Sequence, residues 1–246
     1  MAHEIAANDF LLNSSVPAQS SMSKTSPFSI LPIRLQCLPI TSVISGATYN
    51  YYGSLITENI IEEASSFLAS HSDAEVPDSV RTLNHFLHLT LQDFLDEKKL
   101  EPSRQISLGA WFTIRMTTPN LEYTNMPRWH RDGRMFHCDV EGDVNSKYAI
   151  TLLGNPTRVL AESDLVRKSV TGRQDKRREE YSEQLALEPI LDIKRGEIIK
   201  FSWGETDSPV YSEPDEACDR VFVSVLFGSQ REIRNMCNLR ECTYRE

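Results

Sequence analysis

From residue 108 onward, the chain is a succession of short runs with the alternating pattern of β-strands. The clearest runs cover residues 111–116, 148–153, 157–161, 190–193, 197–202 and 221–227. Successive side chains of a strand point to opposite faces, so a period-two run predicts a strand with one buried face. Many short strands separated by turn residues favour a β sandwich or barrel as the main body.

Two helices are predicted ahead of these strands. The first begins near Thr57, which we take as its N-cap, and carries apolar residues at helical spacing as far as Leu68. The second begins at Asp78 or Ser79 and has a broad apolar face that extends to Leu95. Helices followed by strands predict an α+β chain that is mainly β.

The predicted organisation has four parts. Residues 1–27, rich in Ser, Ala and Asn, form a flexible N-terminal arm, and residues 28–107 supply an edge strand and helices that pack on the core. Residues 108–229 form the core, and residues 230–246 form a polar C-terminal tail. A charged helical insertion at 164–186 interrupts the core as a lid, a dimer contact or a solvated excursion.

Charge and composition argue against several classes of partner. The net charge of −9 disfavours nucleic acid and anionic membrane surfaces, which bind basic patches. No apolar run reaches the length of a membrane span, and the first thirty residues lack a signal-peptide pattern, so we expect a cytoplasmic protein. The five cysteines are scattered, which predicts no disulfide framework. The expected partner is a small-molecule substrate, and the insertion or the arm could support a homodimer.

The sequence W-H-R-D-G carries the strongest chemical signal. On an extended segment, His130 and Asp132 lie on the same side, because side chains alternate with period two. An imidazole and a carboxylate so placed supply two of the three protein ligands of a 2-His-1-carboxylate iron site. A surface loop pair is the other interpretation, but Trp129 offers an apolar partner that would bury the segment.

Two further motifs follow in order along the chain. A glycine turn at Gly196 leads into a strand that ends at Phe201. Further on, S-E-P is followed by D-R-V-F, which places Arg220 at the start of an apolar strand. A guanidinium there could hold a carboxylate in a bidentate pair, or it could form a salt bridge with Asp215 or Asp219.

The order of these motifs resembles the iron(II)/2-oxoglutarate-dependent dioxygenases, in particular a set of small fungal members. The resemblance covers residues 108–229 and implies a double-stranded β-helix core, a jelly roll of the cupin-like kind. It implies that His130 and Asp132 hold Fe(II), and that Arg220 and Ser224 bind 2-oxoglutarate.

The same resemblance implies an oxidoreductase. A dioxygenase of this kind would use O2 and 2-oxoglutarate to oxidise a small organic substrate, for instance an amino-acid derivative or a secondary metabolite in a biosynthetic pathway. Arg115 and Arg158 are the candidates for recognising a carboxylate of that substrate. An oxygenase with an atypical metal site is our leading hypothesis.

The atypical feature is Tyr211, which stands where the family places its distal histidine. Tyr211 could ligate the metal as a tyrosinate, which would favour Fe(III). His137, seven residues after His130, or Glu213 could instead complete the ligand set. In the third alternative no metal binds. His130 beside Asp132 is then a poised base and Tyr211 a proton donor, which suits a metal-independent lyase, isomerase or cyclase, or a non-catalytic binding protein.

Overall fold

The computed structural model describes residues 27–36, 38–100, 107–120, 126–136, 146–170, 178–204, 208–214 and 217–246. The predictions for His137, for Asp215 and for the N-terminal arm up to residue 26 lie outside these residues.

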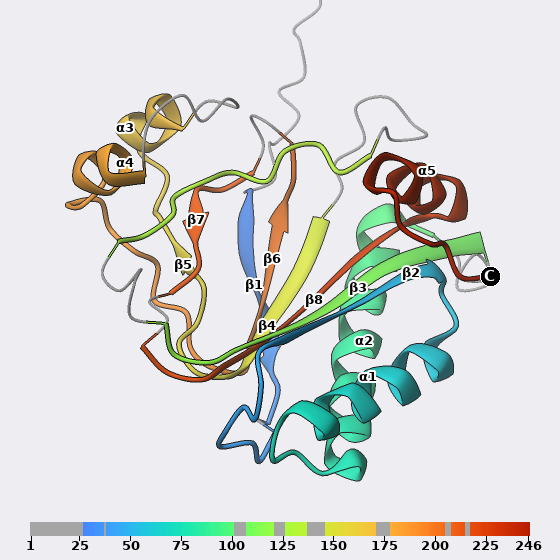
Figure 1. The fold of residues 1–246 in the computed structure, drawn as a ribbon. Helices are drawn as coiled ribbons and strands as arrows, with labels where there is room; N and C mark the ends of the chain where they lie inside the picture. The colour runs from blue at the N-terminus through green and yellow to red at the C-terminus, as the bar shows by residue number, and fades with distance from the viewer. Residues whose placement is uncertain are drawn as a thin grey trace, which may run out of the picture.

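An antiparallel sheet of six strands forms the body of the protein, in the order β1-β6-β4-β8-β3-β2 (Figure 1). A second, two-stranded sheet pairs β5 with β7. The strands are β1 (Phe28–Arg34), β2 (Ala47–Ser54), β3 (Leu108–Thr117), β4 (Ser146–Leu153), β5 (Arg158–Val159), β6 (Glu197–Ser202), β7 (Tyr211–Ser212) and β8 (Arg220–Ser229). The prediction of a mainly β chain with N-terminal helices is confirmed.

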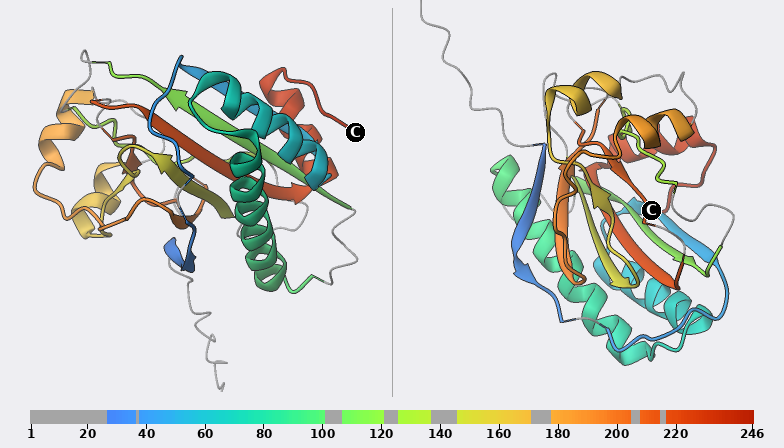
Figure 2. Two further views of the ribbon diagram at one scale, coloured as in Figure 1. Left: turned by 90° about the horizontal axis from the view of Figure 1, so that it is seen from below. Right: turned by 90° about the vertical axis from the view of Figure 1, so that its left-hand side faces the viewer.

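Helices α1 (Thr57–His71) and α2 (Val76–Lys98) cover one face of the large sheet (Figure 2). The N-cap of α1 is Ile56, without a side-chain hydrogen bond, so Thr57 lies inside the helix and is not its cap. Helix α2 begins at Val76, before the predicted start, because Pro77 is well suited to the first turn of a helix.

Alternation along β3 and β8 separates the two faces of the large sheet. One set of side chains packs with the helices in the main core: Ala110, Phe112, Ile114, Val223, Val225 and Phe227. The intervening positions face the other way, and the strand register pairs Trp111 with Leu226 and Thr113 with Ser224. The polar residues within these runs therefore gather on the face opposite α1 and α2.

The small sheet packs on this second face. Tyr211 and Val159 share an apolar cluster with Ala149, Ile199 and Phe201 of the large sheet. A β-bridge between His130 and Tyr211 places the segment of residues 126–136 beside β7. The H-x-D sequence is thereby brought over the polar face of the large sheet.

The insertion contains α3 (Asp164–Ser169) and α4 (Arg178–Gln184). Val166 and Tyr181 from these helices cluster with Trp129 and Val210, next to the small sheet. The buried side chain of Arg131 lies 3.3 Å from a Glu162 carboxylate oxygen and donates to the Val170 carbonyl. The described part of the insertion is therefore packed against the H-x-D segment, and it is not a solvated excursion.

Residues 230–240, expected to belong to a polar tail, form helix α5 (Gln230–Arg240). Ser229 and Glu232 form a capping box, an N-terminal signal that the sequence S-x-x-E carries. Ile233 and Met236 then pack on Leu226 at one end of the polar face. None of the helices within the described residues is long and apolar enough to cross a membrane.

Candidate active site

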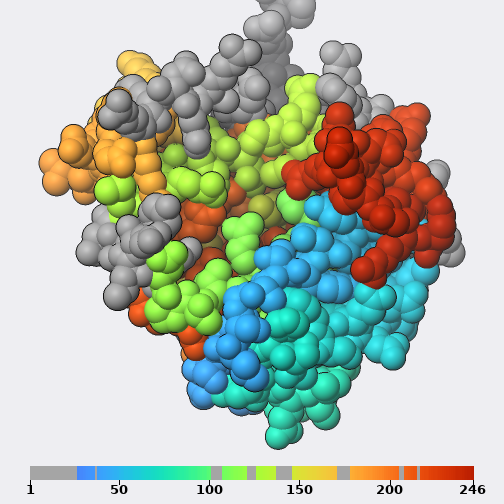
Figure 3. All heavy atoms as spheres, in the orientation of Figure 1, coloured from blue at the N-terminus to red at the C-terminus, as the bar shows by residue number. Residues whose placement is uncertain are grey.

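A cavity of about 220 Å³ lies between the polar face of the large sheet and the segment that carries His130. The space-filling view shows a hollow near the middle of this face of the protein (Figure 3). Its lining consists of Trp111, Thr113, Arg115, Arg128, His130, Asp132, Met135, Lys147, Thr157, Tyr211, Glu213, Arg220, Phe222, Ser224 and Arg240. A larger groove, of about 480 Å³ between α1 and α2, contains none of the candidate residues.

Asp132 has partners on both carboxylate oxygens. The Tyr211 hydroxyl donates to Oδ1 at 2.6 Å, and the Lys147 ammonium donates to Oδ2 at 3.3 Å. The Asp132 backbone N–H donates to the Ser208 hydroxyl at 2.9 Å, and the residue is only 8% exposed. A buried carboxylate is tolerated where hydrogen bonds and an opposite charge compensate for lost water, and Asp132 has both.

Tyr211 is a neutral hydroxyl donor in this arrangement. Burial, followed by the negative charge of Asp132 and their hydrogen bond, raises its pKa well above the ordinary value of 10.0. The Tyr211 ring also contacts that of His130, with centroids 4.3 Å apart. A phenol held in its protonated form does not fit the predicted tyrosinate ligand.

His130 has one nitrogen fixed by the backbone. Its Nδ1 lies 2.8 Å from the Arg128 carbonyl oxygen, which can only accept, so Nδ1 carries the proton. Burial lowers the pKa of His130, although the Arg128 carbonyl and the nearby carboxylates act in the opposite direction. The imidazole is therefore neutral near pH 7, and its lone pair is on Nε2, as a general base requires.

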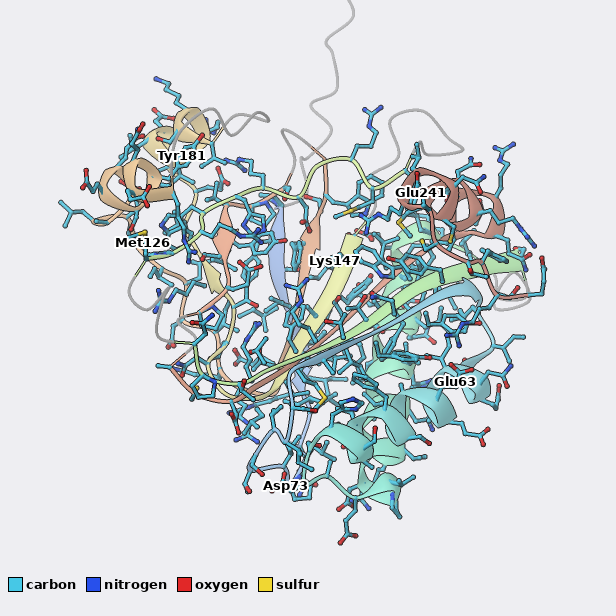
Figure 4. All side chains as sticks on the ribbon, viewed as in Figure 1. Glu63, Asp73, Met126, Lys147, Tyr181 and Glu241 are labelled. Atoms are coloured by element: carbon cyan, nitrogen blue, oxygen red, sulfur yellow. The ribbon has the colours of Figure 1, made fainter. Side chains whose placement is uncertain are left out.

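Lys147 is a site residue that sequence reasoning missed. It lies near the start of β4, where Figure 4 labels it at the upper end of the strand. Its Nζ lies 5.7 Å from the ring centroid of Trp111 and 5.4 Å from that of Phe201. A signal was present, because Lys147 is two residues before Ala149 and so shares its face of the strand.

Arginines dominate the charge around the cavity. Arg128 and Arg115 approach the Glu213 carboxylate at 2.9 Å and 3.6 Å. Burial raises the pKa of Glu213, but the neighbouring His130 and Arg128 outweigh it, and the net shift is downward. Five basic side chains line the cavity against two carboxylates, so it favours an anionic ligand although the whole chain is acidic.

The other predicted residues are divided between the cavity and its surroundings. Arg220 lines the cavity, and its guanidinium donates to the Asn155 carbonyl and the Thr157 hydroxyl, each at 3.1 Å. Ser224 also lines the cavity, opposite Thr113 on β3. Arg158 lies on β5 and is not among the described residues that line the cavity.

The described residues do not fit an iron ion with three protein ligands. Among them, no group of three or more His, Cys, Asp or Glu side chains could hold a metal. Asp132 is engaged by a hydroxyl proton and by an ammonium group, and Glu213 is paired with arginines. Among the predicted metal ligands in the described residues, this leaves Nε2 of His130, since its Nδ1 is the nitrogen that bonds the Arg128 carbonyl.

Comparison with known proteins gives distant structural matches. No family model matches the chain, and no curated protein matches its sequence. A dioxygenase for auxin oxidation in rice shares 8% identity and a TM-score of 0.40, over 84% of this chain and 73% of that one. A Pseudomonas putida prolyl-4-hydroxylase shares 12% identity and a TM-score of 0.35, over 75% and 73%. EvdMO1 shares 16% identity and a TM-score of 0.30, over 54% of this chain but only 32% of that one.

Two of these structures are named as a dioxygenase and a hydroxylase. Their TM-scores lie below 0.5, so no conclusion about the activity of this chain follows from them.

Proposed function

We propose that the cavity is a metal-independent site for proton transfer on a small carboxylate-bearing molecule, built on a double-stranded β-helix scaffold. The observation that carries the proposal is the state of its four central residues. His130 is a neutral imidazole with Nδ1 bonded to a carbonyl, and Tyr211 and Lys147 occupy both oxygens of Asp132. This is an acid–base constellation, and its carboxylate is not available as a metal ligand.

The charge of the cavity supports a carboxylate as the recognised group. Arg115 and Arg128 lie along one wall with Glu213, and Arg220 lies over the Phe222 ring at 4.7 Å. Guanidinium groups bind carboxylates in a bidentate manner. A volume of about 220 Å³ is smaller than that of sites for drug-sized ligands, which suits a molecule of a few carbon atoms.

The proposed reaction uses His130 as the base. Its Nε2 takes a proton from a carbon next to a carbonyl group, and the bonding electron pair moves onto the carbonyl oxygen. The cationic side chains stabilise that developing oxyanion. In a substrate with a β,γ double bond, the electron pair returns through that bond and the far carbon takes the proton from His130, which gives an isomerisation. With a leaving group on the β-carbon, the electron pair expels that group and gives an elimination. Tyr211 packs its ring on the imidazole and holds Asp132 through its hydroxyl, and neither residue takes a proton in either route.

Hydrogen–deuterium exchange tests this proposal without knowledge of the net reaction. The full chain is incubated in D2O and EDTA with 2-oxobutyrate, and loss of the C3 proton signal is followed by NMR. We expect exchange that persists in EDTA and is abolished in His130→Gln. Exchange in that variant at the wild-type rate would contradict the role of His130.

Binding of the carboxylate is measured separately by calorimetry. We expect Arg115→Gln to weaken 2-oxobutyrate binding by about tenfold or more, because a charged hydrogen bond is lost. Arg34→Gln is the matched control, because Arg34 lies on β1 and donates to the Arg195 carbonyl outside the cavity. Equal effects of the two substitutions would count against recognition in the cavity.

The predicted iron oxygenase is the outcome that would replace this proposal. The protein is loaded anaerobically with Fe(II), exposed to O2 and 2-oxoglutarate, and assayed for succinate. Stoichiometric iron with succinate formation that depends on His130 and Asp132 would establish the oxygenase and overturn the metal-independent site.

A further inference from the structure

We propose that the Lys147 ammonium group is a built-in cation that takes the place of a metal ion at Asp132 and keeps divalent metals out of the cavity. The inference rests on the proposed function and deepens it. A site for proton transfer needs a positive charge to stabilise the oxyanion, and the inference assigns that charge to Lys147.

The contacts of Lys147 make it a fixed part of the site. Its Nζ lies 3.3 Å from Asp132 Oδ2, and the two side chains are 11% and 10% exposed. The rings of Trp111 and Phe201 flank the ammonium group, at 5.7 Å and 5.4 Å from their centroids. An ammonium so enclosed interacts with both ring faces and with the carboxylate, which favours this one position over extension into solvent.

The strand register explains why this lysine enters the cavity. On β4, Lys147 pairs with Phe201 of β6 and Leu226 of β8, on the face opposite the helices. Lys200 makes the contrasting case. It lies one residue away on β6, opposite Tyr148, and its ammonium pairs with Asp93 of α2 at 2.7 Å on the helical face. The side chains of Lys147 and Lys200 are 11% and 16% exposed, but Lys200 pairs with Asp93 and Glu97, and only Lys147 reaches Asp132.

A metal bound by Asp132 and His130 would lie within a few ångströms of this ammonium group. Like charges at such a separation repel strongly inside a protein, where the effective dielectric constant is far below that of water. The Tyr211 proton on the other oxygen of Asp132 is a second obstacle. Removing Lys147 should therefore increase the affinity for a divalent ion, and the increase should be largest where a third ligand is supplied.

Lys147 also has donors to offer a substrate. An ammonium group carries three N–H bonds, and Asp132 is its hydrogen-bond partner among the described residues. Lys147 lines the same cavity as His130 and Tyr211, so its remaining N–H groups can serve an oxyanion formed beside His130. In this respect a lysine supplies the electrostatic stabilisation that a metal cation would supply.

A factorial experiment with Co(II) as the probe tests the inference. The full chain is prepared as wild type, Tyr211→His, Lys147→Met and the double variant, with Lys200→Met as the matched control. Binding is measured by equilibrium dialysis and by the visible absorption of bound Co(II), and thermal unfolding verifies that each variant is folded. Tyr211→His supplies a second imidazole, and Lys147→Met removes the charge while keeping the side-chain volume.

We expect no Co(II) binding by the wild type, by Tyr211→His alone or by Lys200→Met. We expect the double variant to bind Co(II) at least about 100-fold more tightly than Tyr211→His, from the removal of one like charge at close range. Comparable Co(II) binding by Tyr211→His and the double variant would overturn the inference, because the metal would then bind although Lys147 is still present. Absence of binding by the double variant would also overturn it, because Lys147 would not be what excludes the metal.

This experiment is independent of the proton-transfer assay. A protein that binds a ligand without catalysis would fail the exchange experiment and still show the factorial pattern. Exchange that survives in His130→Gln while the factorial pattern holds would reject the proposed reaction but not the role of Lys147.

Discussion

Replacing Tyr211 with phenylalanine removes a single hydroxyl group and keeps the ring that packs on His130. The lost interaction is a 2.6 Å hydrogen bond to Asp132 Oδ1, between residues that are 9% and 8% exposed. A hydrogen bond to a charged group contributes about 1.5–3 kcal/mol, and a buried acceptor left without its donor adds a desolvation penalty. We therefore expect Tyr211→Phe to lower the free energy of unfolding by about 2–3 kcal/mol.

Tyr148 offers a matched control. Its hydroxyl donates to Asp93 Oδ2 at 2.8 Å, on the helical face of the large sheet. Both carboxylates have a lysine partner, but the Asp93 side chain is 31% exposed, so water can replace the lost donor. We expect Tyr148→Phe to cost about 1 kcal/mol, because the carboxylate that remains is only partly desolvated.

Urea unfolding followed by fluorescence measures both variants, with an unchanged m-value as the sign that compactness is preserved. For a chain of this size, the loss in Tyr211→Phe corresponds to a fall in Tm of roughly 4–12 °C. A cost for Tyr211→Phe no larger than that for Tyr148→Phe would refute the reasoning. It would mean that the Asp132 carboxylate is not held by the Tyr211 hydroxyl in a desolvated cavity.

The remaining predictions concern pH and helix capping. Because the pKa of Tyr211 is raised in the folded state, its contribution to the free energy of unfolding is present below pH 10 and decreases at higher pH, where only the unfolded state ionises. The difference in stability between wild type and Tyr211→Phe, measured by urea unfolding, should therefore shrink above pH 10. Because the pKa of His130 is lowered in the folded state, its contribution to the free energy of unfolding is present above pH 6.5 and is lost as the pH falls through the folded-state pKa. The stability of His130→Gln should therefore be less sensitive to acid than that of the wild type. Equal acid sensitivity of the two proteins would contradict this. Ser229→Ala should cost about 1 kcal/mol in thermal unfolding, because Ser229 and Glu232 cap α5 reciprocally, and a neutral result would contradict that cap.

The placement of His130 and Asp132 in one cavity could be predicted because it depends on local spacing. Two residues separated by one on an extended segment share a side whatever the rest of the fold does. The same rule identified β3 and β8 as strands with one apolar face. Arg115 and Ser224, which the family resemblance implies as site residues, both line the cavity on the polar face of these strands.

Lys147 could not be predicted as a partner of Asp132 from the sequence, because nothing local relates the two. Lys147 reaches Asp132 through the pairing of β4 with β6 and β8, and through the packing of the H-x-D segment over that face. Arg240 was missed for another reason. It lies on α5, in a stretch whose polar composition predicts a tail, although Ser229 and Glu232 form a capping box at its start.

The sequence by itself determined that the chain is mainly β, that two helices precede the main run of strands, and that the W-H-R-D-G segment supplies two residues of the cavity, His130 and Asp132. These features depend on periodicity and on residues close together in the chain. Only the tertiary structure decided which partners Asp132 has, because Tyr211 and Lys147 come from different sheets and meet only when the small sheet packs on the large one. As a result Asp132, an expected metal ligand, has a hydroxyl donor on one oxygen and an ammonium group on the other.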